Sequence, residues 1–191
     1  MTIKNYWQTL SDVLSLISFS DDSGKEKDID SFLSEIVEII TPLVASSKKV
    51  IFIGNGGSAS IASHMAIDFW KNAKIKAVCF NDPAQLTCLA NDYGSHQLFS
   101  QPLSVFGDKG DVLFAISSSG KSENILNAVA IAKEKGLVTI SLSGFSKDNP
   151  LRKLGNANIY VPSSSYGVVE SLHAVICHCI LDKLIENRQY I

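Results

Sequence analysis

The chain has 191 residues, a formal net charge of −2, 46% hydrophobic residues and 19% charged residues. This length accommodates one sizeable core and is short for two domains, so a single domain over residues 1–191 is predicted. The near-neutral charge gives no basic footprint for direct nucleic-acid binding, and no apolar run reaches the ~20 residues that span a membrane. Because the N-terminus lacks a signal-peptide pattern, we expect a cytoplasmic location.

The first 45 residues predict two helices. Apolar residues recur at helical spacing from Tyr6 to Phe19 and again from about Ser31 to Ala45, with a polar break over residues 20–30. We interpret residues 1–45 as an antiparallel helical pair. Because both helices are amphipathic, the pair needs a partner surface, which is either the chain's own core or a neighbouring subunit.

From residue 49 onward, short apolar runs alternate with helical patterns. Strands are predicted at residues 49–54, 75–80, 111–117, 137–144 and 157–162, and helices at residues 60–71, 85–90, 122–135 and 168–186. Continuous apolar strands separated by helices are typical of a parallel sheet that is covered on both faces. With right-handed crossovers, the predicted fold class is α/β, a three-layer doubly wound parallel sheet of Rossmann-like type.

Two predicted loops carry residues suited to a phosphate group. The first, "GNGGS" at residues 54–58, places consecutive glycines before a helix, where backbone N–H groups attract anions; alone, it is equally consistent with a tight turn. The second, "ISSSGKS" at residues 116–122, places four serine hydroxyls before a helix. One helix cap needs one serine, so four favour phosphate binding over capping.

A third loop is predicted at residues 89–96, "LANDYGSH". Its Asn91 and Asp92 are able to accept hydrogen bonds from sugar hydroxyls. Asn-Asp pairs are also common in turns, and from the residues alone the turn is the favoured interpretation.

Histidines and carboxylates occur on two predicted helices. His64 and Asp68 are four residues apart and therefore share one helix face. On the last helix, Glu170 and His178 lie roughly 80° apart around the axis and about 12 Å apart along it, so sharing one ion requires Glu170 to lie at the frayed helix entry. His173 lies among apolar neighbours and is interpreted as a buried core histidine.

Four motifs occur in order along the chain: "GNGGSASIASH", "LANDYG", "GDVLFAISSSGKSENILNA" and "VESLHAVICHCILDKLIE". Together they resemble the phosphoheptose (sedoheptulose 7-phosphate) isomerases of the sugar-isomerase, or SIS, fold. The resemblance covers nearly the whole chain, including the two N-terminal helices. It is very specific for the SIS superfamily and less specific for heptose as the substrate.

The resemblance implies roles for particular residues. The implied substrate contacts are Asn55, Gly56, Gly57, Ser58, Asn91, Asp92, Ser117, Ser118, Ser119 and Ser122. The implied zinc ligands, for one zinc per subunit, are His64, Asp68, Glu170 and His178. The implied general base is Asp68 or Glu170, and the implied general acid is His178.

Two positions depart from the family pattern. Asp68 stands where the family usually has glutamate, and Glu170 stands where it has glutamine. We interpret the two changes as a variant but working site.

The resemblance also implies an activity and an assembly. The expected reaction converts sedoheptulose 7-phosphate to the heptose 7-phosphate used for lipopolysaccharide or capsule sugars. The expected assembly is a homotetramer with sites near subunit interfaces. Two alternatives stay open: a non-catalytic SIS protein that binds the bacterial replication initiator, and an isomerase of a different phosphosugar.

Overall fold

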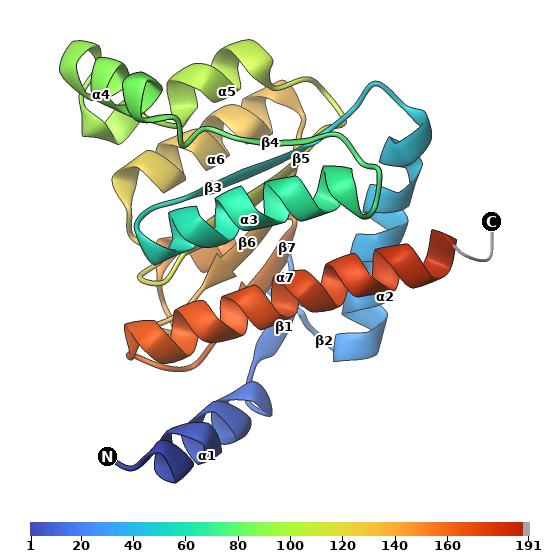
Figure 1. Ribbon diagram of the computed structural model, residues 1–191, viewed down its shortest axis with the longest axis vertical. Coiled ribbons are helices and arrows are strands. Elements are labelled where there is room, and N and C mark those ends of the chain that lie inside the picture. The colour runs from blue at the N-terminus through green and yellow to red at the C-terminus, as the bar shows by residue number, and fades with distance from the viewer. Residues whose placement is uncertain (189–191) are drawn as a thin grey trace.

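The computed structural model describes residues 1–188, which form an α/β sandwich around one sheet (Figure 1). The sheet has seven strands in the order β2-β1-β7-β6-β5-β3-β4. Their bounds are β1 Ser18–Asp21, β2 Glu26–Lys27, β3 Val50–Gly54, β4 Ala77–Cys79, β5 Val112–Ser117, β6 Val138–Ser143 and β7 Ala157–Tyr160. Strands β3 to β7 pair in parallel, whereas β1 and β2 join antiparallel. The predicted α/β fold is confirmed, and residues 189–191 of the predicted domain lie outside the described residues.

Helices cover both faces of the sheet. Their bounds are α1 Ile3–Leu14, α2 Ile29–Ile40, α3 Gly57–Lys71, α4 Pro83–Asp92, α5 Ser100–Phe106, α6 Glu123–Lys135 and α7 Tyr166–Arg188. Side chains alternate across each strand, so Val50 and Phe52 of β3 pack with α2, α3 and α7, whereas Ile51 and Ile53 pack with α5 and α6. Among residues 1–188, no helix has the combination of length and apolar character that crossing a membrane requires.

The two N-terminal helices form, but they do not make the expected antiparallel pair. Helix α2 packs on α7 and β1, and α1 contacts α7; Figure 1 shows α1 and α2 on different sides of the molecule. Helix α2 also ends earlier than predicted, at Ile40, and continues as a 3₁₀ turn over Thr41–Ala45. Pro42 explains this end, because proline lacks the N–H group that a continuing α-helix needs.

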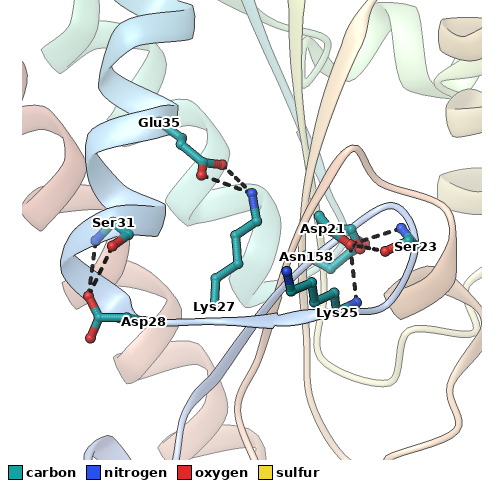
Figure 2. A network of polar contacts seen from close by, with 8 residues as sticks. All are labelled: Asp21, Ser23, Lys25, Lys27, Asp28, Ser31, Glu35 and Asn158. Atoms are coloured by element: carbon teal, nitrogen blue, oxygen red, sulfur yellow. Dashed lines mark hydrogen bonds and ion pairs between the residues drawn. The ribbon is translucent and has the colours of Figure 1, made fainter.

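An unpredicted β-hairpin of β1 and β2 spans residues 18–27, so it begins inside the predicted first helix, which in the structure ends at Leu14, and continues into the polar break. Asp21 closes its turn: one carboxylate oxygen accepts hydrogen bonds from the backbone N–H groups of Ser23 and Lys25 at 3.0 and 3.1 Å (Figure 2). The Asn158 side chain on β7 donates to the Asp21 carbonyl at 3.2 Å. The hairpin joins the sheet through the antiparallel pairing of β1 with β7, and this bond reinforces the pairing. The N-terminal segment thus adds strands to a sheet that was expected to begin at residue 49.

The hairpin leads directly into α2. Asp28 caps the helix by accepting hydrogen bonds from the backbone N–H groups of Asp30 and Ser31, at 3.1 and 3.2 Å. Lys27 of β2 forms an ion pair with Glu35 of α2 at 2.6 Å (Figure 2). These contacts fix the angle between the hairpin and the helix.

The strand order predicts which edge of the sheet binds a ligand. Strand β3 pairs with β4 on one side and with β5 on the other, so the chain winds in opposite directions from this point. Ligands of doubly wound sheets bind at the carboxyl ends of the strands where this reversal occurs. The two predicted phosphate loops follow β3 and β5 and therefore meet at this edge.

Candidate functional site

A cavity of about 250 Å³ lies at the carboxyl ends of β3 and β5. It is lined by Asn55, Gly56, Gly57, Ser58, Ser117, Ser118, Ser119, Ser122, Tyr166 and Glu170. The structure thus brings together all eight candidates from the two loops. The last two lining residues come from the first turns of α7, and Tyr166 was not among the sequence candidates.

The first loop turns sharply into α3. Gly56 has φ +54°, a left-handed conformation that suits glycine, and α3 begins at the next residue. The first N–H groups of a helix have no partner within it and carry a positive partial charge. A methyl group on Gly57 would overlap the Glu170 carboxylate, so this glycine leaves room for that carboxylate beside the loop.

A pair of amide side chains joins the first loop to α6, the helix that follows the second loop. Asn55 and Asn124 exchange two hydrogen bonds, each 2.9 Å long, between the first loop and α6. Sequence reasoning assigned Asn55 to the substrate and missed Asn124. Because the pairing uses both the amide nitrogen and the amide oxygen of Asn55, we infer that this side chain holds the first loop against the start of α6.

The second loop presents hydroxyl groups with few partners. The Ser118 side chain is buried, and its Oγ has no hydrogen-bond partner among the described residues. Ser122 precedes α6 without capping it and instead accepts a hydrogen bond from the Ser117 hydroxyl at 3.3 Å. A buried hydroxyl without a partner is costly in a native protein and indicates a missing ligand or water.

A buried asparagine supports the second loop from behind. Asn149 is fully buried, and its amide nitrogen donates to Ser143 Oγ at 3.2 Å and to the Gly144 carbonyl at 3.1 Å. The loop residue Gly120 packs against it with φ +61°, and its carbonyl accepts a hydrogen bond from Leu151 N–H at 3.1 Å. Asn149 therefore fixes the loop to the end of β6, and no local sequence pattern marks it for this role.

The charge of the cavity is unusual for an anion site. Among the described residues that line it, none is lysine or arginine, and Glu170 is the one charged side chain. The groups that would attract an anion there are backbone N–H groups, hydroxyls and the N-terminal ends of α3 and α6. The Glu170 carboxylate would oppose it.

A second group of polar residues lies where α3 and α7 pack together. His64, Asp68 and His178 each offer a ligand atom, and these atoms lie within 4.8 Å of one another. His64 Nε2 is 3.2 Å from Asp68 Oδ2, and the two imidazole rings are 5.3 Å apart. Two imidazoles and one carboxylate with an open fourth position match the donor set of a catalytic zinc site.

The carboxylate of Glu170 is not part of that group. It lies against Gly57 in the cavity, and His178 is eight residues further along α7, a rise of about 12 Å. Regular helix at Glu170 explains the difference, because the predicted sharing of one ion required a frayed helix entry. Within one subunit the structure therefore places three of the four predicted ligands together.

Asn91 and Asp92 are exposed and do not line the cavity. They form the last turn of α4, which is longer than predicted because Asp82 caps its start, accepting hydrogen bonds from Ala84 and Gln85 N–H. The predicted loop therefore begins only after Asp92. Asn91 donates a hydrogen bond to the Asp92 side chain at 2.8 Å.

His173 is buried in the core, as its apolar neighbours indicated. Its Nε2–H donates to the Ser143 carbonyl at 3.2 Å, and Nδ1 has no partner among the described residues. Burial lowers the pKa of His173 to about 4, which outweighs the opposite effect of the Ser143 carbonyl. The residue is neutral near pH 7 and takes no part in the cavity.

The buried histidine makes stability depend on pH. Between pH 6.5 and pH 4 the unfolded chain binds a proton at His173 that the folded chain excludes, so the free energy of unfolding falls as the pH falls. The gap between the two pKa values corresponds to about 3 kcal/mol. Urea unfolding of wild type and His173→Gln at several pH values measures this contribution, and identical pH profiles would contradict it.

The family model for the SIS domain matches residues 23–144. A phosphoheptose isomerase of Cytophaga hutchinsonii is 37% identical in an alignment of 187 residues that covers 94% of each chain. The structure of a phosphoheptose isomerase from Francisella tularensis superposes with a TM-score of 0.83 at 25% identity, covering 97% of this chain and 100% of that one. The phosphoheptose isomerase of Neisseria gonorrhoeae gives a TM-score of 0.74 at 28% identity, covering 81% and 86%. The chain therefore belongs to the phosphoheptose isomerase family of SIS-domain proteins.

Proposed function

We propose that this chain interconverts sedoheptulose 7-phosphate and D-glycero-D-manno-heptose 7-phosphate, for lipopolysaccharide or capsule heptose. Family membership supports a phosphosugar isomerase of heptose synthesis. The observation that carries the proposal is the cavity of N–H and hydroxyl donors, with His64, Asp68 and His178 further along the same two helices.

The two ends of the substrate need two separate subsites. The phosphate group is at one end of the sugar, and the two reacting carbons are at the other. The cluster lies seven residues along α3 from Gly57 and eight along α7 from Glu170, which corresponds to about 10–12 Å. We propose that the cavity binds the phosphate and that the sugar chain extends along α3 and α7 toward the cluster.

The reaction moves one proton between adjacent carbons. A base removes a proton from the hydroxymethyl carbon next to the ketone, which gives an enediolate, and the proton is returned to the former ketone carbon. We assign the base role to Asp68 or Glu170, and the acid that serves the two oxygens is His178. Phosphate binding remote from the reacting carbons orients the sugar.

The donor set of the cluster fits zinc, and we propose one zinc per subunit. His64, Asp68 and His178 would hold it, whereas Glu170, the fourth predicted ligand, lies in the cavity about 12 Å along α7 from His178. When bound, zinc would polarise the oxygens of the sugar. Because Asp68 lies at the reacting end of the sugar and Glu170 at the phosphate end, we assign the base role to Asp68.

We propose a homotetramer with sites near subunit interfaces. Helix α1 has no fully buried residue, and its Ile3 and Trp7 are 70% and 66% exposed. His64 of the cluster has an exposed side chain. A neighbouring subunit that covers α1 and α3 would bury both. We place this assembly in the cytoplasm.

Incubation with sedoheptulose 7-phosphate, with and without zinc, tests the function. NMR is expected to show the aldose accumulating to an equilibrium mixture. No conversion under either condition would favour the alternative of a non-catalytic SIS protein that binds the bacterial replication initiator. Conversion of other ketose phosphates at higher rates would favour an isomerase of a different phosphosugar.

Replacing Asp68 and Glu170 with the residues that the family usually has tests whether the two changes work together. The double variant Asp68→Glu with Glu170→Gln is expected to retain or raise turnover, because it removes the charge that opposes the phosphate and extends the remaining carboxylate. The single variants serve as controls, and circular dichroism checks the fold. Loss of turnover in a folded double variant would contradict this interpretation.

A further inference from the structure

Tyr166 is the one aromatic residue among the described residues that line the cavity. It is the first residue of α7, and its side chain is 62% exposed. The other lining residues are the two loops and the Glu170 carboxylate. Tyr166 therefore adds an aromatic ring to an otherwise polar site.

The Tyr166 ring is held in place by Phe145. The two ring centroids are 4.7 Å apart, with the planes at 77°. This edge-to-face geometry is the favoured arrangement of an aromatic pair. It fixes the Tyr166 ring at the cavity although most of its surface is exposed.

Phe145 is itself held in an uncommon conformation. Its φ is +57°, the left-handed region that non-glycine residues rarely adopt. Two hydrogen bonds fix it: Phe145 N–H donates to the Ser163 carbonyl at 2.9 Å, and the Tyr160 hydroxyl donates to the Phe145 carbonyl at 3.0 Å. Strain of this kind persists where the surroundings hold it and is concentrated at functional sites. Phe145 is thus a fixed support behind Tyr166, which lines the cavity.

The rest of the cavity wall suits a phosphate but offers little to sugar carbons. A phenol ring has an apolar face that packs against C–H groups and a hydroxyl that exchanges hydrogen bonds with sugar hydroxyls. We propose that Tyr166 contacts the carbons next to the phosphate ester, at the end of the sugar far from the cluster, and so favours a phosphosugar over inorganic phosphate. Phe145 is a positioning residue that acts through Tyr166. The proposal rests on the proposed binding of the substrate's phosphate in this cavity.

Titrations with two ligands separate sugar contact from phosphate contact. A heptitol 7-phosphate lacks the carbonyl group and cannot isomerise, so its Kd is measured without turnover; inorganic phosphate is the second ligand. Tyr166→Ala is expected to raise the Kd of the heptitol phosphate roughly tenfold, with little change for inorganic phosphate. Tyr166→Phe keeps the ring and is expected to show a smaller increase.

Phe106→Ala, at another exposed aromatic residue, controls for the loss of a ring and is expected to leave both Kd values unchanged. Equal changes for both ligands in Tyr166→Ala would overturn the proposal, because they would mean that the phosphate loops had moved. An unchanged Kd for the heptitol phosphate would also overturn it. Failure of the proposed function looks different: wild type would bind the heptitol phosphate and would not convert the ketose.

Discussion

Replacing His178 with alanine is expected to lower kcat for sedoheptulose 7-phosphate by about 10²–10⁴-fold, the usual contribution of a general acid or base. The change removes the proposed acid and one of three donor atoms that lie within 4.8 Å of one another. The cavity is lined by other residues, so the Kd of inorganic phosphate is expected to stay unchanged. Steady-state kinetics and a phosphate titration measure the two effects.

Zinc content distinguishes the two roles of His178. If the residue is a ligand, both His178→Ala and His64→Ala are expected to bind less than one zinc per subunit; if it is the acid alone, only the His64 variant loses metal. His96→Ala, at an exposed histidine beyond α4, is the matched control and is expected to turn over like wild type. Wild-type kcat in His178→Ala would remove this residue from the mechanism.

Gly120→Ala is expected to lower the free energy of unfolding by about 2–5 kcal/mol, through a strained backbone and an overlap in the core. Gly120 has φ +61°, and the added methyl group would lie 2.8 Å from Asn149 Cβ. Asn149 is fully buried and hydrogen-bonded, so it has no room to move. The serine loop must therefore shift to remove the overlap, and KM for the phosphosugar is expected to rise as well.

Gly24→Ala is the matched control for this variant. Gly24 also has a left-handed backbone, with φ +79°, but an added methyl group would meet nothing within 4 Å. Its cost is expected to be the backbone strain alone, about 1–2 kcal/mol. Chemical denaturation of both variants measures the difference, and equal losses would mean that the contact with Asn149 contributes nothing.

The central fold was predictable because its signals are local. Strands β3 and β5 are continuous apolar runs, and the glycine and serine loops follow them directly. The rules for parallel sheets then place both loops at one edge. The hairpin of β1 and β2 carried no such signal, since Phe19 is the one apolar residue of strand β1 and the pairing with β7 joins residues far apart in sequence.

The support of the site was not predictable for the same reason. Asn55 and Asn124 are 69 positions apart. Asn149, in the segment after β6, packs against Gly120, in the loop after β5. Nothing in the local sequence marks such partners as different from ordinary turn residues. The convergence of His64 and His178 depends on the packing of α3 against α7, for which the family resemblance was the available guide.

The two borders of the sheet also bear on how copies of this protein associate. One border is β2, with two residues that include Lys27, and the other is β4, with three residues. Both outer strands are short, and β2 is also charged, so they offer little template for the backbone of another molecule. Growth by adding strands is therefore blocked at both ends, and contact between copies falls to side chains of the outer helices. This arrangement favours a closed assembly of defined size over open-ended aggregation.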